Sequence, residues 1–294
     1  MPELPDVTVY IEGLERFAVG HTVERARAIN PFVLRSVDPP LSAVEGRRLI
    51  AASRVGKRIV LSVDGDVHVV IHLMIAGRLR WREPGKKLGG KLAQAAFEFP
   101  HGTLYLTEAG SKRRASLHLV RGMDAVRSMD RGGLDVFVAT RDEFAAQLRR
   151  ENHTLKRSLT DPRFFDGIGN AYSDEILHRA RMSPMTLTSR LTDEEIARLL
   201  DATRSTLTEW IDRLRDEVGS GFPETVTAFR EGMAVHGRFG KPCPVCGTPV
   251  QRIRYADNET NYCARCQTGG KLLADRALSR LLKQDWPRSI DELE

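Results

Sequence analysis

The sequence predicts an α+β protein with several domains, and three observations support this prediction. β-branched and aromatic segments fill most of the first 125 residues, apolar residues then recur at helical spacing, and four cysteines lie close together near the end. A chain of 294 residues is also long for one hydrophobic core. We therefore expect an N-terminal antiparallel β-sandwich or barrel, a helical domain and a small cysteine-rich ribbon, in that order.

The N-terminal domain is expected to cover residues 1–126. After an opening helical stretch, four segments are rich in β-branched and aromatic residues, alternate in part, and are separated by Gly, Asp or Pro; these are 58–63, 67–81, 95–99 and 103–107. Residues 127–140, with the sequence RSMDRGGLDVFVAT, resemble a linker to the next domain.

The helical domain is expected at residues 141–234. Residues 141–151 read as one helix, and 191–218 as a longer one that begins with a capping box formed by Thr192 and Glu195. One face of the longer helix is apolar apart from a threonine; it carries Ile196, Leu199, Leu200, Thr203, Leu207, Trp210, Ile211 and Leu214. A zinc ribbon is expected at 235–270 and a helical tail at 271–294.

The cysteines predict a structural zinc site in that ribbon. Two Cys-x-x-Cys pairs are separated by sixteen residues and consist of Cys243, Cys246, Cys263 and Cys266. Four thiolates at this spacing form a closed tetrahedral site without an open position for catalysis. One zinc ion is therefore expected, although ribbons of this kind occur in many protein classes.

Composition limits the possible functions without choosing among them. The formal net charge is +6, which permits nucleic acid as a partner but does not prove it. The sequence has no apolar run near the ~20 residues needed to span a bilayer, and the start MPELPDVTVY lacks the features of a signal peptide. We therefore expect a cytosolic protein, in which grouped cysteines favour metal over disulfides.

A glycine-containing turn at 161–177, DPRFFDGIGNAYSDEIL, is a candidate anion site. Gly167 and Gly169 permit close backbone approach, and Asn170 is a good N-cap for the helix that follows. Backbone N–H groups at a helix start can hold a phosphate. An ordinary helix–turn–helix hairpin capped by Asn170 is an equally good interpretation of this motif alone.

The amino terminus is a candidate nucleophile. Removal of Met1 would leave Pro2 with a free secondary amine, whose pKa near 8 keeps part of it unprotonated at neutral pH. Such an amine can attack an aldehyde-like carbon and form an iminium, with Glu3 as general acid or base. Alternatively, PELP is only a stiff start to the chain.

Taken together, these motifs make the chain resemble the formamidopyrimidine-DNA glycosylase / endonuclease VIII family of base-excision-repair enzymes. The resemblance covers about residues 1–270. It rests on PELPDV, GKRIVL, IHLMIAGRLR, LKRSLTDPRFFDGIGNAYSDEIL, VHGRFGKPCPVCGTPVQRIR and YCARCQ, which occur in this order.

The resemblance implies a fold and a mechanism. The fold is a β-sandwich with flanking helices, a helix–two-turns–helix domain and a zinc ribbon, with double-stranded DNA that contains a damaged base or an abasic site as partner. The family flips the damaged nucleotide out of the duplex. The N-terminal proline then attacks C1′, the base leaves, and the iminium permits elimination of the flanking phosphates. A monomer is expected.

Site residues follow by matching motifs. Pro2 is implied to be the nucleophile and Glu3 the acid/base that assists ring opening, while Asp6 stands where the family usually has glutamate. Lys57 matches a lysine that holds a phosphate near the lesion, and Asn170 the turn asparagine that binds a phosphate. Further DNA contacts are implied for Ile75, Arg113, Arg114, Lys156 and the position of Asn258. Without the motifs around them, Lys57 and Lys156 would be interpreted as ordinary solvated surface lysines.

The chain departs from the family pattern at three places. Asn258 occupies the position of the ribbon arginine that grips phosphates, and Arg252 and Arg254 lie on the same hairpin. Ile75 occupies the position of the methionine that fills the gap left by the flipped base, with Met74 beside it as an alternative. Family members usually end soon after the last cysteine, whereas this chain continues with a tail that either packs on the ribbon or binds a partner.

Two functions remain open on these grounds. The first is a DNA glycosylase with apurinic/apyrimidinic lyase activity, which Pro2 and Glu3 favour. The second is a DNA-binding protein without glycosylase activity that recognises abasic or distorted DNA on the same scaffold, which Asn258 favours. An intermediate form would keep the lyase with narrow or weak base removal.

Overall fold

The computed structural model describes residues 1–86, 88, 92–109, 112–224, 230–255, 258–283 and 287–293. The chain divides into two compact units, one made of Met1–Arg131 with Trp210–Thr227 and the other of Gly132–Glu209 with Ala228–Glu294. The limits expected for the individual domains stay a prediction.

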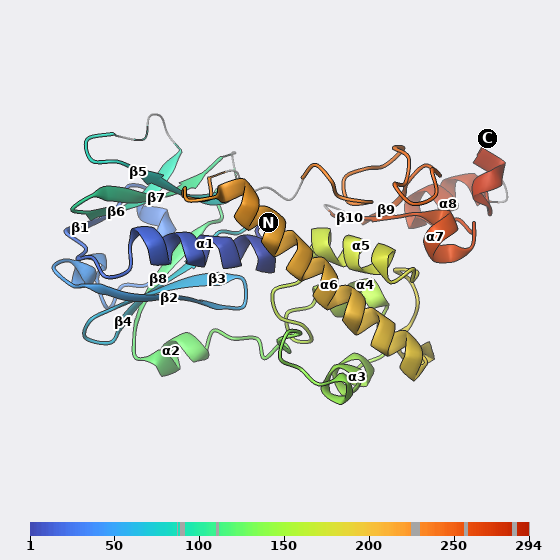
Figure 1. Ribbon diagram of the computed structural model, residues 1–294, viewed down its shortest axis with the longest axis horizontal. Coiled ribbons are helices and arrows are strands. Elements are labelled where there is room, and N and C mark those ends of the chain that lie inside the picture. The colour runs from blue at the N-terminus through green and yellow to red at the C-terminus, as the bar shows by residue number, and fades with distance from the viewer. Residues whose placement is uncertain are drawn as a thin grey trace. The chain divides into compact units, whose positions relative to one another are not determined.

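The first unit is a sandwich of two four-stranded antiparallel sheets, drawn as stacked layers in Figure 1. One sheet has the order β1-β6-β7-β5 and the other β2-β3-β4-β8. The strands are β1 Arg25–Ala28, β2 Leu49–Val55, β3 Arg58–Val63, β4 Val67–His72, β5 Gly77–Arg82, β6 Ala93–Phe99, β7 Gly102–Glu108 and β8 Ser116–Arg121. The alternative of a closed barrel is wrong, because the two sheets are separate.

Helical segments flank this sandwich. They are α1 Leu4–Phe17, the short helices η1 Pro31–Val33 and η2 Leu41–Val44, and α2 Met123–Arg127. Helix α1 lies against β2 and β3 (Figure 1). Its apolar side chains join the core between the sheets, where Val7, Tyr10 and Leu14 are fully buried. The first residues of the chain are thereby fixed to the sandwich.

The expected strand segment 67–81 is two strands in different sheets. Strand β4 ends at His72 and β5 begins at Gly77, with a turn between them. A β-carbon at Gly77 would lie 2.2 Å from the Leu73 carbonyl oxygen, so only glycine fits this close approach. The apolar run hides the turn, because no Asp, Asn or Pro marks it.

The helical part of the second unit contains α3 Arg141–Arg149, α4 Leu155–Thr160, α5 Asn170–Arg179, η3 Thr188–Arg190 and the first part of α6 Asp193–Val218. The expected capping box of α6 is present, because Thr192 and Glu195 each accept the other's backbone N–H. The expected apolar stripe of α6 is buried. None of the helices among the described residues is long and apolar enough to cross a membrane.

The ribbon and the tail complete the second unit. The ribbon hairpin consists of β9 Gln251–Tyr255 and β10 Asn258–Tyr262, and is followed by α7 Ala264–Thr268, α8 Arg276–Leu282 and η5 Ile290–Leu293. Leu272 and Ile290 of the tail pack against Ile253 and Tyr262 of the hairpin. The tail therefore packs on the ribbon, and its helix is shorter than the sequence suggests.

Candidate functional site

The amino-terminal end of α1 holds Pro2 and Glu3 in a buried position. Pro2 is buried and Glu3 is 2% exposed. Glu3 is the N-cap of α1, and a capping box joins it to Asp6, whose Oδ2 accepts the Glu3 N–H at 2.8 Å. The carboxylate of Asp6 thus fixes the backbone immediately after Pro2.

Charged side chains surround the amino terminus. Burial lowers the pKa of the Met1 amino group below its usual 8.0; Glu3 and Asp6 oppose this shift, whereas Arg78 and Lys57 reinforce it. Lys57 is half-buried in the β2–β3 turn, and Arg78 lies near the start of β5. The fold therefore brings Lys57 within electrostatic range of the amino terminus.

Arg78 also connects this cluster with the turn that carries Ile75. Its Nη1 donates to the Ile75 carbonyl at 3.2 Å and to the Gly77 carbonyl at 2.6 Å. The Ile75 side chain is 60% exposed, whereas Met74 is half-buried with φ of +52°. Ile75 is thus the protruding apolar side chain of this turn.

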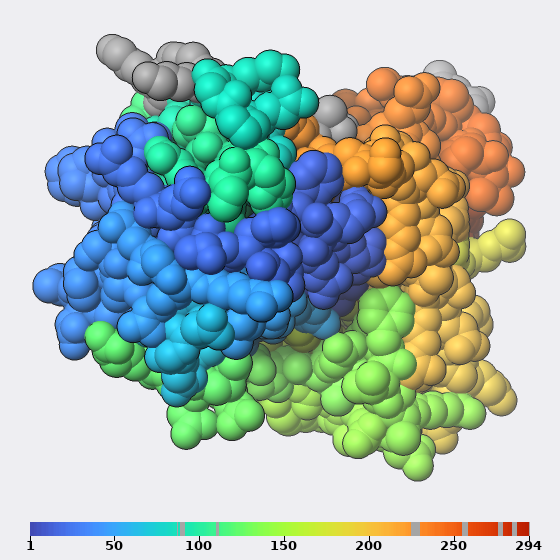
Figure 2. Space-filling view, turned by 60° about the vertical axis from the view of Figure 1, so that its left-hand side comes forward, coloured from blue at the N-terminus to red at the C-terminus, as the bar shows by residue number. Residues whose placement is uncertain are grey.

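Figure 2 shows part of the dark-blue N-terminal segment at the surface of the same unit.

A second exposed loop carries Arg113 and Arg114. Glu108, buried at the end of β7, accepts the backbone N–H groups of Arg114 and Ala115 through its carboxylate. The two arginine side chains are exposed. The buried carboxylate therefore holds the backbone of a loop whose two arginines lie at the surface.

In the second unit the Asn170 turn differs from the expected capping arrangement. Gly169, not Asn170, is the N-cap of α5, and Asn170 is the first helical residue. The expected N-cap role of Asn170 is therefore wrong. Instead its side-chain amide donates to the carbonyl of Glu259 on β10 at 3.0 Å, and Glu259 directly follows Asn258 in the sequence. Gly167 has φ of +75°, a conformation that favours glycine.

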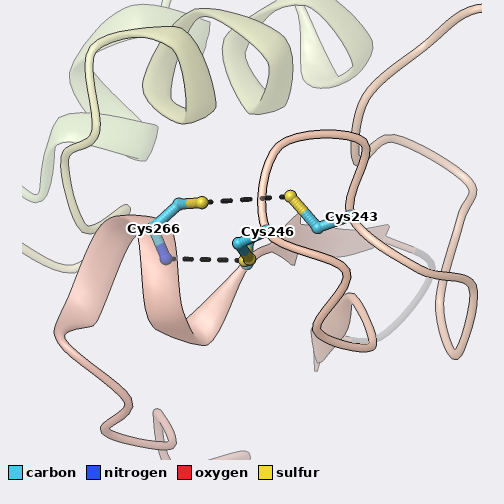
Figure 3. A group of neighbouring side chains, drawn as sticks. Cys243, Cys246 and Cys266 are labelled. Atoms are coloured by element: carbon cyan, nitrogen blue, oxygen red, sulfur yellow. Dashed lines mark hydrogen bonds between the residues drawn. The ribbon is translucent and has the colours of Figure 1, made fainter.

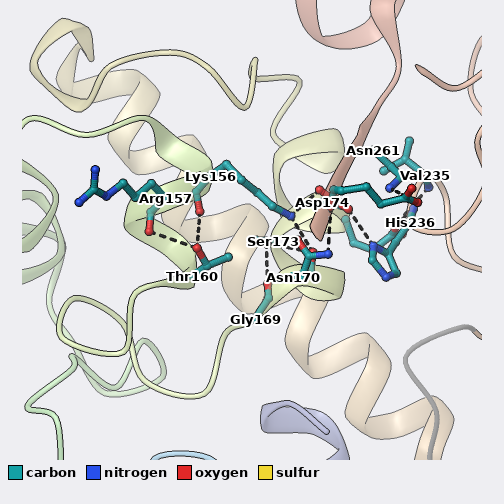
Figure 4. Close-up of polar contacts among 12 residues, drawn as sticks. Lys156, Arg157, Thr160, Gly169, Asn170, Ser173, Asp174, Val235, His236 and Asn261 are labelled. Carbon is teal, nitrogen blue, oxygen red and sulfur yellow. Dashed lines mark hydrogen bonds and ion pairs between the residues drawn. The ribbon is translucent and has the colours of Figure 1, made fainter. Parts of the chain in front are cut away.

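Lys156 lies at the centre of a buried polar network. It is 8% exposed, so the interpretation as a solvated surface lysine is wrong. Its Nζ donates to the Asn170 carbonyl at 2.7 Å and to Asp174 Oδ1 at 2.5 Å, while Asp174 Oδ2 contacts His236 Nδ1 at 2.7 Å (Figure 4). The pKa of the adjacent Glu175 is raised by burial, although its carboxylate accepts three backbone N–H groups from residues 234–236.

The tip of the ribbon hairpin carries Asn258, the residue that the sequence has at the position of the family's arginine. Asn258 is exposed at the start of β10, where its backbone is paired with Tyr255. Arg252, on β9, stacks on the Phe239 ring at 4.1 Å from its centroid and contacts Glu259 at 3.5 Å. Arg254 is exposed. Arg252 is thus engaged within the ribbon, and Arg254 is paired with Glu259, on the opposite face of the hairpin from Asn258.

The four cysteines converge and fit one zinc ion. All four sulfur atoms lie within 4.8 Å of one another. The Cys243 and Cys266 sulfur atoms are 3.9 Å apart (Figure 3), and those of Cys246 and Cys263 are 3.4 Å apart. Tetrahedral zinc with Zn–S bonds of about 2.3 Å requires sulfur separations of about 3.8 Å. The expected structural zinc site is consistent with this cluster.

Three residues of these sites were not identified from the sequence. Arg78 is one of three arginines that alternate with buried residues on β5, and this alternation is the available signal. Asp174 and His178 follow Asn170 at intervals of four residues on α5, where polar residues on a buried helix indicate specific partners. His178 Nε2 lies 3.3 Å from Cys243 Sγ.

Comparison with known proteins agrees with this architecture. Residues 1–115 match the family model described as the formamidopyrimidine-DNA glycosylase N-terminal domain, residues 137–220 the H2TH domain of the same proteins, and residues 240–269 a zinc finger found in FPG and IleRS.

Whole-chain relatives extend the similarity. A formamidopyrimidine-DNA glycosylase from Heliobacterium modesticaldum is 34% identical over 281 residues, which cover 91% of this chain and 100% of that protein. The crystal structure of the MutM (Fpg) protein from Thermus thermophilus has a TM-score of 0.76 at 32% identity, and the match covers 90% of this chain and 98% of that one. A Lactococcus lactis Fpg bound to DNA with an abasic site has a TM-score of 0.80 at 23% identity, covers 90% of this chain and 99% of that one, and shares the fold.

Proposed function

The chain belongs to the formamidopyrimidine-DNA glycosylase family, and on that premise we propose that it is a base-excision-repair DNA glycosylase with apurinic/apyrimidinic lyase activity. The observation that carries this proposal is the arrangement at the amino terminus. Pro2 directly precedes Glu3, the N-cap of α1, and Lys57 and Arg78 lie near enough to lower the pKa of the Met1 amine. A protein that only binds DNA has no use for such an amine.

The proposed reaction begins with removal of Met1, which exposes the Pro2 secondary amine. Burial lowers the pKa of the Met1 amine, and Pro2 is buried in the same segment, so we expect the Pro2 amine to be partly neutral. Its lone pair is then available to attack C1′ of a nucleotide flipped out of the duplex. A C1′–N bond to Pro2 forms and the bond to the base breaks, so that the base leaves with the electron pair and takes up the proton that the Pro2 nitrogen loses. Glu3 gives a proton to the sugar-ring oxygen as the ring opens to the iminium.

The iminium makes the following eliminations possible. It acidifies the C2′ proton, and loss of this proton expels the 3′ phosphate, which cleaves the strand. Water then attacks C1′ and releases Pro2 as the free amine. The chain's own residues supply the nucleophile and the acid/base, and the zinc ion would hold the ribbon hairpin in place through its four thiolates.

The proposed DNA contacts lie in both units. Lys57, Arg113 and Arg114 would hold phosphates in the first unit, and Ile75 would fill the space of the flipped base. In the second unit the Asn170 turn would bind a phosphate through its backbone and the second N–H of its side-chain amide. Lys156 would act there by holding the Asn170 carbonyl, because its ammonium group is already paired with Asp174.

A second candidate is favoured by one observation. Asn258 is uncharged and exposed at the tip of the hairpin, where the family has a phosphate-binding arginine. A DNA-binding protein that recognises abasic or distorted sites without removing bases would tolerate this change. The abasic-site complex of the Lactococcus lactis protein supports that class of ligand for either function.

Strand cleavage of duplex DNA with one abasic site separates the two candidates. We expect the full chain, with its amino terminus verified by mass to be Pro2, to cleave this DNA. Pro2→Gly should lose most cleavage while its binding of the same duplex stays within about twofold. If protein that starts at Pro2 binds this DNA without cleaving it, the proposed enzymatic activity is wrong and the DNA-binding function remains.

A further inference from the structure

Helix α5 presents a row of polar side chains to the ribbon. Asn170, Asp174 and His178 are spaced by four residues, so they lie along one face of the helix. Each contacts the C-terminal part of the chain: Asn170 donates to the Glu259 carbonyl, Asp174 contacts His236, and His178 contacts Cys243. The row therefore runs from the turn at the start of α5 to the cysteine cluster.

The last member of the row reaches a predicted zinc ligand. His178 is 6% exposed, and its Nε2 lies 3.3 Å from Cys243 Sγ, within the range of a hydrogen bond to sulfur. Sulfur of a zinc thiolate is an acceptor, so the ring nitrogen must carry the proton and donate. Cys243 itself is 2% exposed, so water has little access to satisfy this sulfur from outside.

The charge of the site explains why a donor is needed. Zinc with four thiolates carries a net charge of about −2, and a buried negative charge is costly unless hydrogen bonds stabilise it. Within the ribbon, the backbone N–H of Cys266 points to Cys263 Sγ at 3.5 Å. His178 supplies a hydrogen-bond donor to the Cys243 sulfur, and it lies on α5, outside the ribbon.

We propose that His178 is an outer-sphere hydrogen-bond donor of the zinc centre, which retains zinc by stabilising the Cys243 thiolate and fastens the ribbon to α5. The zinc site then extends beyond its four cysteines into the helix that begins with Asn170. Outer-shell partners of this kind typically change metal affinity by about 10- to 100-fold. This proposal does not depend on the glycosylase activity, because every readout below is of the metal.

Zinc transfer to a chromophoric chelator tests the proposal on the full chain. We expect His178→Phe, which keeps a planar ring but removes the donor, to release zinc about tenfold faster. His178→Gln, which keeps an N–H at similar reach, should restore most of the retention. His153→Phe is the matched control in the same unit, since this histidine contacts Glu151 and the Phe164 ring.

Equal release rates for His178→Phe and the unmodified chain would overturn the proposal, as would equal acceleration by His153→Phe. Spectra of the cobalt-substituted protein add a readout that packing alone would not move. A hydrogen bond stabilises the thiolate lone pair, so its loss in His178→Phe should shift the sulfur-to-cobalt charge-transfer band to longer wavelength. An unshifted band would contradict the hydrogen bond.

A measurement without substitution covers the case in which His178→Phe fails to fold. In the unmodified chain loaded with ¹¹³Cd, the ring N–H proton of His178 should show scalar coupling to the metal through Cys243 Sγ. Coupling would establish the hydrogen bond directly. A His178 ring proton observed without this coupling would overturn the proposal.

Discussion

Lys156 and Asp174 form a buried ion pair at 2.5 Å, with side chains that are 10% and 0% exposed. Asp174 also contacts His236, and Lys156 also holds the Asn170 carbonyl. The sequence predicts that Lys156 contacts DNA. Its ammonium group instead stabilises the Asn170 turn, which is the proposed DNA-binding element. Loss of either partner leaves a charge in a buried position.

Stability measurements test this role of Lys156. Lys156→Met removes the cation that is paired with Asp174, so we expect the free energy of unfolding in denaturant to fall by about 3 kcal/mol. Lys156→Met combined with Asp174→Leu should recover part of this loss, because no buried charge is left uncompensated. A loss below about 1 kcal/mol in the single variant would mean that the pair does not secure the turn.

Much of the fold could be predicted from the sequence, whereas the partners inside the second unit could not. The strand and helix patterns, the capping box of α6 and the cysteine spacing are all local signals. Lys156 and Asp174 are 18 residues apart and His178 and Cys243 are 65 apart, so only the tertiary fold joins them. The N-cap of α5 is Gly169 and not the predicted Asn170, whose side-chain amide contacts β10 instead.

The amino terminus should give a distinctive pH dependence. Burial and the charges of Arg78 and Lys57 lower the pKa of the terminal amine below 8.0, and we expect the same direction for Pro2 in that buried segment. Single-turnover cleavage of abasic DNA should therefore rise with pH as the amine loses its proton and level off below pH 8. Lys57→Ala removes one of the lowering charges, so its profile should move to higher pH. A profile that still rises steeply above pH 8 would contradict the shift.

Ile75 should matter for duplex DNA and not for single strands. Ile75→Ala removes about 1–2 kcal/mol of apolar contact, which corresponds to roughly tenfold slower base removal from a duplex. Folding should be unaffected, because the side chain is 60% exposed. Cleavage of a single-stranded abasic site serves as the control, since no base stack has to be filled there. An equal loss on both substrates would argue against a wedge.

Asn258→Arg should strengthen DNA binding. One added phosphate contact should steepen the slope of log affinity against log salt by about 0.9, through counterion release. Asn258→Gln, which is neutral, provides the matched control. If the two variants bind with the same salt dependence, the tip of the hairpin does not face the phosphates and the departure at this position carries no functional meaning.

Borohydride trapping tests most directly whether Pro2 forms a covalent bond to the sugar. The full chain, its amino terminus verified by mass, is mixed with duplex DNA that carries one abasic site and reduced, and the adduct is digested and mapped. We predict an adduct on Pro2 that is absent in Pro2→Gly. An absent adduct, or one mapped to a lysine side chain, would contradict the proposed mechanism.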